Sequence, residues 1–250
     1  MIDLHAHVLP GVDDGPATLA DSLALARAAV AAGTRVMVAT PHVNDRYDAA
    51  VAALPGAVAA LQAELDRAQV PLALRSGAEI ATSRLPALDA GLLERLALGG
   101  GEWLLLEAPE RGPADVPAAV AIARERGFRV VLAHAERCEA LRRDPTALRR
   151  LVAGGVLVSI TAGSLDGKFG DSPRRFAGLL LRERLVHNVA SDTHAVQGRP
   201  PDVSAARRAL PAPLWEWMTG AVPAAVLDGA AIPPAPRERQ GWRARLSRRA

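Results

Sequence analysis

The chain has 250 residues, of which 50% are hydrophobic and 23% charged, a composition that can bury a sizeable core and excludes a disordered polypeptide. No apolar run approaches the ~20 residues of a membrane span, and no signal peptide precedes the first strand-like segment, so we expect a cytoplasmic protein. A single cysteine, Cys138, excludes an internal disulfide and a thiolate zinc site.

The positive charge of the chain is concentrated at its C-terminus. Six arginines from Arg237 onward, against the single acid Glu238, change the formal net charge from −2 for residues 1–236 to +3 for the whole chain. We therefore expect one domain at residues 1–232 and a disordered Pro/Arg-rich tail at 233–250, which can touch an anionic membrane surface or an acidic partner weakly. No specific nucleic-acid partner is expected, and the oligomeric state is unknown.

Short β-branched or apolar runs alternate with longer stretches of helical period. The strand-like runs are, in chain order, Ile2–His5, Arg35–Ala39, Leu72–Arg75, Trp103–Leu106, Arg129–Ala133, Val156–Ile160 and His187–Ala190. Helices are expected between them at about 18–32, 48–69, 114–127, 144–154 and 171–185. This alternation predicts parallel strands joined by right-handed crossovers.

The number of these units decides between the two common parallel folds. Seven units in ~230 residues, without a Gly-rich dinucleotide loop, favour a barrel over an open doubly wound sheet. The predicted fold is therefore α/β, an irregular seven-stranded (β/α)7 TIM-like barrel. Pro86 and Gly91 interrupt the shorter stretch between the third and fourth strands, and beyond Pro211 we expect two Trp-bearing turns and a Pro-rich break.

Side chains that bind metal ions follow most of the predicted strands. Histidines or carboxylates stand at or beyond the carboxyl end of six of the seven runs: His5, His7, Asp13, Asp14, His42, Glu79, Glu107, His134, Asp192 and His194. In a closed parallel barrel these ends converge on one face, where active sites are built. Glu107 is a strong candidate because a carboxylate after three apolar strand residues is costly to bury unless a cation neutralises it. His187 begins the last strand, away from that face, and is predicted to be structural.

So many nitrogen and oxygen ligands exceed the needs of one ion, whereas two or three ions about 3.5–4 Å apart would use them all. The ligand types suit Mn, Fe, Zn or Mg ions. Such a cluster supports hydrolysis, above all of phosphate esters, by in-line attack of a metal-bridged hydroxide without a phospho-enzyme. Arg137 and Arg199 follow two of the ligand-bearing strands and are candidates to bind the phosphoryl oxygens. Cys138 is excluded as a nucleophile because Asp144 stands six positions on, where a cysteine phosphatase needs arginine.

These motifs are similar to those of a known superfamily. His5-Ala-His7, Thr40-Pro-His42, Gly77-Ala-Glu79, Glu107, His134-Ala-Glu-Arg137 and Ser191-Asp-Thr-His194 resemble the metal motifs of the PHP (polymerase and histidinol phosphatase) superfamily. The opening segment 1–15 and the segment 160–170 further resemble the manganese-dependent protein-tyrosine phosphatases of bacterial capsule and exopolysaccharide loci, the CpsB/CapC type. The likeness extends from residue 1 to about residue 210 in the same order.

The resemblance implies a site and a substrate. Residues 1–232 would form a PHP-type metal-dependent phosphatase barrel holding three ions, most readily Mn²⁺, with Fe, Zn, Mg or Co as alternatives. Asp14 rather than Asp13 would be the loop ligand, and Arg137 and Arg199 would grip the phosphoryl group. The implied substrate is phosphotyrosine on a membrane-linked bacterial tyrosine kinase that regulates polysaccharide export. The implied metal ligands are His5, His7, Asp14, His42, Glu79, Glu107, His134, Asp192 and His194.

Two departures and two alternatives accompany this reading. Val43-Asn44-Asp45 precedes Arg46 where the family is often basic, and the segment after Pro211 matches poorly. The same metal chemistry also fits a small-molecule phosphatase of the superfamily, such as one acting on histidinol phosphate, or a phosphodiesterase. A non-catalytic metal-binding module tethered by the basic tail is the alternative of another class, and the presence of every candidate ligand argues against it.

Overall fold

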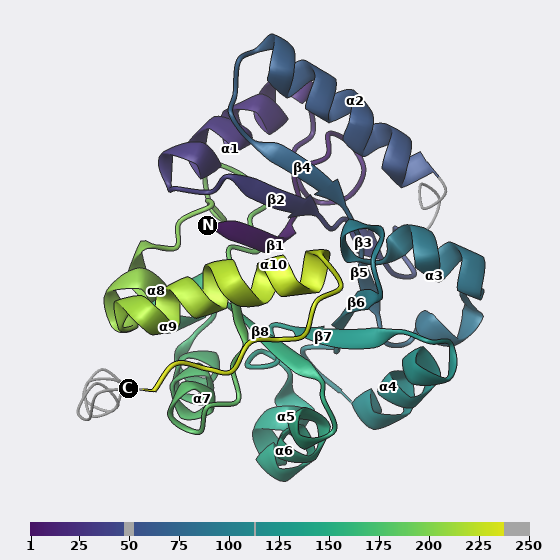
Figure 1. The fold of residues 1–250 in the computed structure, drawn as a ribbon, viewed down its shortest axis with the longest axis vertical. Helices are drawn as coiled ribbons and strands as arrows, with labels where there is room; N and C mark the ends of the chain where they lie inside the picture. Colours follow the sequence, from purple (N-terminus) through teal and green to yellow (C-terminus); the bar gives the residue numbers. More distant parts are fainter. Residues whose placement is uncertain (48–52, 113, 238–250) are drawn as a thin grey trace.

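The computed structural model describes residues 1–47, 53–112 and 114–237 of the chain. The first residues of the predicted helix 48–69 and five of the six arginines of the predicted tail therefore lie outside the described residues. In the described part, strands and helices alternate, as the sequence predicts (Figure 1).

All strand pairs among the described residues are parallel. One sheet has the order β1-β2-β4 and the other the order β3-β5-β6-β7-β8-β9. The strands are β1 Ile2–Ala6, β2 Val36–Ala39, β3 His42–Val43, β4 Ala73–Ser76, β5 Glu79–Ala81, β6 Trp103–Glu107, β7 Arg129–Ala133, β8 Leu157–Thr161 and β9 Asn188–Ala190. The α/β class and the parallel arrangement are thus confirmed.

Nine strand segments are described where seven strands were expected, because the second and third predicted strands each continue beyond a break. Between β2 and β3 stands Pro41, which has no N–H to donate to a neighbouring strand. Between β4 and β5 stands Gly77, where a Cβ atom would lie 2.8 Å from Cγ1 of Val38. Since β2 pairs with β4 and β3 with β5, both breaks fall at one level and divide the strands into two sheets.

The first strand lies beside the segment that follows the last one. Ala6 and Thr193 form a parallel bridge, and the His7 N–H donates to the carbonyl oxygen of Thr193 at 2.9 Å. The buried carboxylate of Asp3 accepts hydrogen bonds from the backbone N–H groups of Ser191 at 3.1 Å and His5 at 3.3 Å. These contacts bring the two ends of the strand series together.

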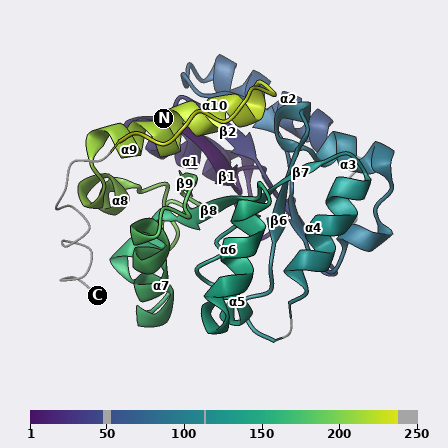
Figure 2. The same ribbon diagram turned by 60° about the horizontal axis from the view of Figure 1, so that its bottom comes forward.

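Helices connect the strands and cover their outer side. The helices α4, α5 with α6, and α7 follow one another around the outside of β6, β7 and β8 (Figure 1, Figure 2). Several begin at a capping side chain, such as Thr18, which forms a capping box with Asp21. The helices are α1 Leu19–Ala31, α2 Leu54–Arg67, α3 Ala90–Leu96, α4 Val116–Glu125, α5 Glu139–Arg143, α6 Pro145–Ala153, α7 Asp171–Arg182, α8 Ser204–Ala209, α9 Ala212–Glu216 and α10 Val222–Leu227, with 3₁₀ turns η2 Leu85–Ala87, η3 Leu98–Gly100 and η4 Ala162–Asp166.

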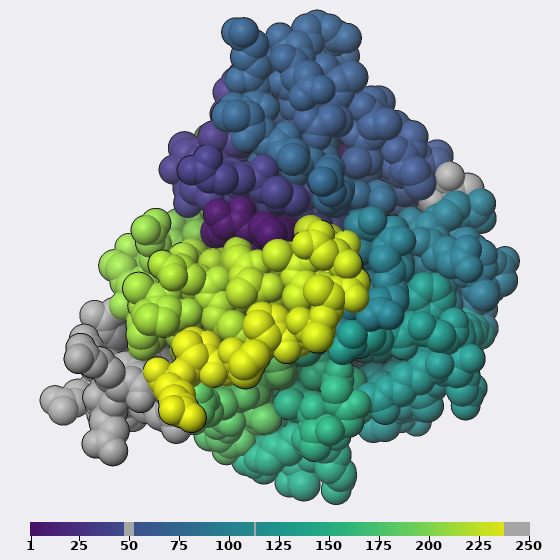
Figure 3. Space-filling view, viewed as in Figure 1, coloured from purple at the N-terminus to yellow at the C-terminus, as the bar shows by residue number. Residues whose placement is uncertain are grey.

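The segment after Pro211 is helical, which corrects the expectation of two Trp-bearing turns. The helix α9, a π-helical turn η5 (Trp217–Ala221) and α10 follow one another without a gap. Buried side chains recur at every fourth position. Pro213 falls in the first turn of the run, where no N–H is needed, and Pro223 follows the π-helical turn. The helix α10 contacts β1 and η3, and the C-terminal segment covers the middle of this face beside the first residues of the chain (Figure 3). The periodic buried residues are Leu214, Met218, Val222 and Val226.

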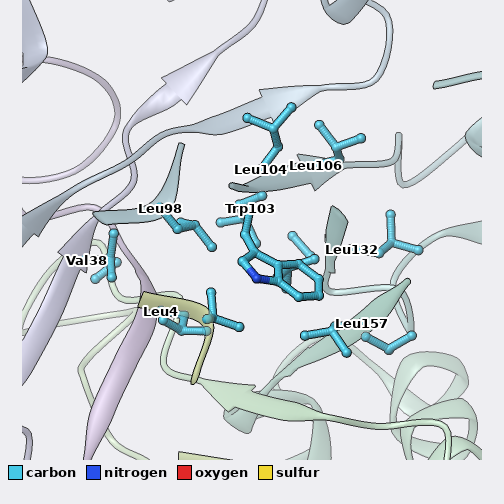
Figure 4. Close-up of a cluster of buried hydrophobic side chains, with 14 of the residues drawn as sticks. Leu4, Val38, Leu98, Trp103, Leu104, Leu106, Leu132 and Leu157 are labelled. Carbon is cyan, nitrogen blue, oxygen red and sulfur yellow. The ribbon is translucent and has the colours of Figure 1, made fainter. Parts of the chain in front are cut away.

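The core fills the space among the strands. Trp103, the first residue of β6, is fully buried and lies among Leu4, Leu98 and Leu157 (Figure 4). The guanidinium carbon of Arg129 lies 3.9 Å from the centre of the Trp103 indole, which closes the outer edge of this cluster. The apolar core therefore occupies the level at which β6 begins, and the carboxyl end of the same strand is left for polar residues. Among the described residues, no helix combines the length and apolar character needed to cross a bilayer.

Candidate metal centre

Strand register brings the predicted ligands together. His42 in β3 is paired with Glu79 in β5, so their side chains stand at the same level. Glu107 ends β6 and is paired with Ala133, the residue directly before His134. His42 and Glu79 open β3 and β5 just beyond the carboxyl ends of β2 and β4, whereas Glu107 ends β6 and His134 follows β7. Because the carboxyl ends of parallel strands meet at one edge, these side chains converge although up to 92 positions separate them in the sequence.

Two of the predicted ligands lie on strained backbone. His134 directly follows β7 with a φ of 28°, and Asp192 lies two residues beyond β9 with a φ of 52°. Backbone hydrogen bonds hold both conformations: the Arg137 N–H donates to the His134 carbonyl at 2.8 Å, and the Asp192 N–H donates to the His5 carbonyl at 3.0 Å. Such conformations are uncommon outside glycine and concentrate at functional sites.

All nine predicted ligands belong to one cluster. Their nitrogen and oxygen atoms form four groups, and within each group the donor atoms lie within 4.8 Å of one another. The groups share members, so the cluster is continuous. The groups are His7 with Asp14, His42 and His194; His5 with Glu79 and His134; His5 with His7 and Asp192; and His42 with Glu79 and Glu107.

Glu79 is the centre of the cluster. Its Oε2 lies 3.2 Å from His5 Nε2, 3.3 Å from His7 Nε2 and 3.0 Å from His42 Nδ1. Its Oε1 lies 2.7 Å from His134 Nε2. The carboxylate is 1% exposed, so water does not solvate it, and its charge has to be balanced by the groups around it.

Two further carboxylates, those of Asp192 and Asp14, lie next to histidines of the cluster. Asp192 Oδ1 lies 3.5 Å from His5 Nε2 and 3.7 Å from His7 Nε2, and this side chain is buried. Asp14 Oδ1 lies 3.3 Å from His194 Nε2. The Asp14 side chain is 45% exposed, so it stands at the solvent side of the cluster.

Neighbouring charges govern the ionisation of these groups. Burial opposes ionisation of Glu79, but the facing His5 and His134 hold the pKa of its carboxyl well below the usual range. Burial and the adjacent charge of Glu79 raise the pKa of Glu107. Burial alone would lower the pKa of His7, yet its contacts with the carboxylates of Asp13 and Glu79 raise it to about 10. The carboxylates therefore require positive charge beside them, which a divalent cation supplies.

The donor atoms fit metal ions better than they fit one another. Glu79 Oε2 and His42 Nδ1 are buried and lie 3.0 Å apart, yet neither makes a hydrogen bond of good geometry among the described residues. The Nε2 atoms of His5 and His7 face each other at 3.2 Å, so both nitrogens point into the cluster, where neutral imidazoles are metal ligands. Imidazole nitrogen and carboxylate oxygen in this number suit two or three divalent cations.

The two predicted arginines lie at the edge of the cluster and share one carboxylate. Arg137 Nη1 donates to Asp192 Oδ2 at 2.7 Å, and Arg199 Nη2 donates to the same oxygen at 2.5 Å. Arg199 Nη1 also lies 2.9 Å from His194 Nε2. Both guanidinium groups therefore stand next to the donor atoms without belonging to any of the four groups.

Asp13 has a role that the sequence did not reveal. Its Oδ2 lies 2.6 Å from His7 Nδ1 and accepts a hydrogen bond from the His42 N–H at 3.1 Å. It therefore orients the His7 ring so that Nε2 points into the cluster, whereas the neighbouring Asp14 belongs to one of the four groups of candidate donors. Gly15 permits this turn, because a Cβ there would lie 2.9 Å from the His7 carbonyl oxygen. The only signal in the sequence is the pair of aspartates before a glycine.

His187, predicted to be structural, and Cys138, excluded as a nucleophile, belong to none of the four donor groups. Val158 donates its N–H to His187 Nδ1 at 3.2 Å, the His187 ring lies 6.0 Å from that of Trp217, and burial lowers its pKa to about 4. Cys138 is buried at the start of α5.

Beside the cluster, a cavity of about 530 Å³ borders Glu107 and has mostly apolar walls, among them Pro109 and Ile122.

Comparisons with known proteins give the family. The family model for capsular polysaccharide synthesis, CpsB/CapC, matches residues 1–214. The tyrosine-protein phosphatase YwqE of Bacillus subtilis is 37% identical over 201 residues, covering 80% of this chain and 79% of that protein. CpsB of Streptococcus agalactiae serotype V, named a tyrosine-protein phosphatase, is 27% identical over 223 residues and covers 84% of this chain and 89% of that protein.

Solved structures agree with the sequence comparison. One chain, from work on YwqE of Bacillus subtilis and CpsB of Streptococcus pneumoniae described as unique metal-dependent tyrosine phosphatases, superposes with a TM-score of 0.82. It is 32% identical, and the match covers 96% of this chain and 100% of that one. A variant organophosphorus hydrolase from Deinococcus radiodurans shares the fold alone, with 16% identity, a TM-score of 0.58 and 90% and 92% coverage. The extent of these matches shows that the chain belongs to the CpsB/CapC family of capsular polysaccharide synthesis.

Proposed function

We propose that the chain is a metal-dependent protein-tyrosine phosphatase that hydrolyses phosphotyrosine on a bacterial tyrosine kinase regulating capsular or exopolysaccharide synthesis. The observation that carries the proposal is the cluster of nine donors, all but Asp14 buried or half-buried, with two guanidinium groups at its edge. Relatives that are named tyrosine-protein phosphatases support the reaction. The family description, capsular polysaccharide synthesis, supports the choice of kinase.

The nine donors would hold two or three ions, which we propose to be Mn²⁺, with Fe, Zn, Mg or Co as alternatives. When bound, such ions would lower the pKa of a bound water molecule to a value near neutrality and would polarise phosphoryl oxygens. The chain itself fixes the ligands: Asp13 orients His7, and Glu79 keeps four imidazoles within 3.3 Å of its oxygens. The proposed ligands are His5, His7, Asp14, His42, Glu79, Glu107, His134, Asp192 and His194.

Arg137 and Arg199 would bind the phosphoryl group. Both donate to Asp192 Oδ2, so their N–H groups converge on one oxygen acceptor beside the cluster. A phosphoryl dianion presents several such acceptors, and charge builds on them during transfer, which paired guanidinium groups stabilise. We propose that water is the nucleophile and that no phospho-enzyme forms, since the lone thiol of Cys138 is buried and has no arginine six positions on.

The cavity beside Glu107 supports a substrate with a sizeable organic part. Its volume of about 530 Å³ and its apolar walls give room for an aromatic ring and neighbouring atoms next to the site of cleavage.

As a further part of the proposal, the strands form a closed irregular seven-stranded barrel, which the contacts between β1 and the end of β9 support. The cytoplasmic location and the division into residues 1–232 and 233–250 remain predictions.

A comparison of substrates tests the proposal. We expect the Mn²⁺-loaded protein to hydrolyse a phosphotyrosine peptide with kcat/KM at least about a hundredfold above that for histidinol phosphate, and chelation to abolish both activities. Steady-state release of inorganic phosphate measures both reactions. Preferred turnover of histidinol phosphate would overturn the substrate class. If the metal-loaded protein hydrolyses none of the esters, the proposal that it is an enzyme is wrong, and the alternative of a non-catalytic metal-binding module is supported.

A further inference from the structure

The segment 160–170, which resembles the family in sequence, contributes none of the nine donors and neither arginine. It places one aromatic ring against both guanidinium groups. The guanidinium carbon of Arg137 lies 4.3 Å from the centre of the Phe169 ring, and that of Arg199 lies 5.8 Å from it. Resting on the phosphatase function proposed above, we propose that Phe169 is a positioning residue that holds the two arginines in the geometry that receives the phosphoryl group.

The position of Phe169 is fixed by its own segment. Glu136, which is fully buried, accepts a hydrogen bond from the Thr161 N–H at 2.9 Å and from the Ser164 hydroxyl at 2.6 Å. The turn η4 is thereby tied to the residues that follow β7. The chain returns beside Gly163, where a Cβ would lie 3.0 Å from Lys168 Cδ and 3.4 Å from Phe169 Cε2. The ring therefore rests on a braced turn.

Arg137 has defined partners on its edges as well as on its face. Its Nη1 donates to Asp192 Oδ2 at 2.7 Å, and its Nε donates to Glu110 Oε1 at 2.7 Å. These in-plane bonds leave the guanidinium free to tilt about the line that joins the two carboxylates. A ring against the face removes that freedom, and the attraction between a guanidinium and an aromatic face favours the flat arrangement. Phe169 thus supplies the one constraint that the carboxylates do not.

Phe169 stands outside the hydrophobic core. It is half-buried, whereas the other two phenylalanines, Phe128 and Phe176, belong to the buried cluster. Replacing Phe169 with leucine therefore removes the aromatic face at little expense to folding. Phe128→Leu is a matched control, because it makes the same change in the core and away from the arginines.

The test compares Phe169→Leu with Phe169→Tyr, which keeps the ring. In the Mn²⁺-loaded protein, we expect Phe169→Leu to weaken binding of inorganic phosphate about tenfold and to lower kcat/KM for a phosphotyrosine peptide by a similar or larger factor. Metal content and the thermal unfolding temperature should stay unchanged. Phe169→Tyr should retain both properties, and Phe128→Leu should lower stability without changing phosphate affinity.

A double-mutant cycle with Arg137→Ala completes the test. If Phe169 acts through the arginines, Phe169→Leu causes a smaller loss in the Arg137→Ala background than in the wild type, because only Arg199 is left for the ring to hold. An unchanged phosphate affinity of Phe169→Leu, or a full further loss in the Arg137→Ala background, would overturn the inference. Inorganic phosphate measures binding alone. If the peptide is not hydrolysed, that failure counts against the proposed phosphatase, whereas the phosphate affinity of Phe169→Leu still tests the role of the ring.

Discussion

Asp192→Asn is expected to lower kcat for a phosphotyrosine peptide by at least about a thousandfold, which corresponds to about 4 kcal/mol of lost transition-state stabilisation. Asp192 faces two ways: Oδ1 lies 3.5 Å from His5 Nε2, and Oδ2 accepts hydrogen bonds from Arg137 and Arg199. Burial opposes its ionisation, but His5 and Arg199 hold its pKa below the usual range, so the full charge is present. An amide has no charge and puts an NH₂ group against one of these two sets of partners.

The fold should survive this substitution. Asparagine has the same shape and, with aspartate, is among the few non-glycine residues that adopt a φ near the 52° of this position. Circular dichroism and thermal unfolding of the metal-loaded variant measure the fold, and phosphate release measures kcat. Asp66→Asn, on the exposed side of α2, is the control that should keep full activity. An Asp192→Asn protein that is unfolded with metal present, or that keeps more than about a tenth of the activity, would contradict the role given to Asp192.

Arg137→Ala is expected to lower kcat/KM for the same peptide by about a hundredfold to a thousandfold while the metal content stays at the wild-type value. Arg137 is a cation and cannot itself bind a metal ion, and Asp192 keeps hydrogen bonds from Arg199 and the Thr161 hydroxyl when Arg137 is removed. The loss should fall on phosphoryl binding, so the affinity for inorganic phosphate should decrease as well.

Arg137→Lys separates charge from geometry in this prediction. Lysine restores a positive charge but cannot donate in a plane to Asp192 and Glu110 at the same time, so we expect only a partial recovery. Metal analysis of the purified variants is the deciding control. A metal content that falls in proportion to activity would mean that Arg137 supports the cluster and does not bind the phosphoryl group.

The strands could be predicted because their burial leaves a direct mark on the sequence. The predicted run Arg129–Ala133 has the bounds of β7, and the other runs differ from their strands by one residue at one end or at both. The sequence does not predict the breaks at Pro41 and Gly77. The strand resumes after Pro41 because β3 pairs with β5, and Gly77 is needed because Val38 of the neighbouring strand lies close to it. The segment after Pro211 forms helices where turns are predicted, and its apolar side chains from Leu214 to Val226 do recur at helical spacing.

The donor cluster could be predicted for a simple topological reason. Residues that follow the carboxyl ends of parallel strands lie at one edge of the sheet. Polar residues after apolar runs can therefore be predicted to meet there before the details of the fold are known. The supporting residues follow no such rule. Asp13, Glu110 and Phe169 act through side-chain contacts, and Arg137 is 27 positions from Glu110 and 32 from Phe169. Only the folded chain brings these partners into contact.

The proposed chemistry requires that nine side chains from six strand ends hold several cations at one place. Anomalous diffraction from crystals grown with Mn²⁺, recorded at the manganese absorption edge, tests it most directly. We predict two or three peaks, each about 2.0–2.3 Å from imidazole nitrogens or carboxylate oxygens of this cluster and about 3.5–4 Å apart. A crystal with no peak there, or with manganese bound elsewhere on the chain, would contradict the account.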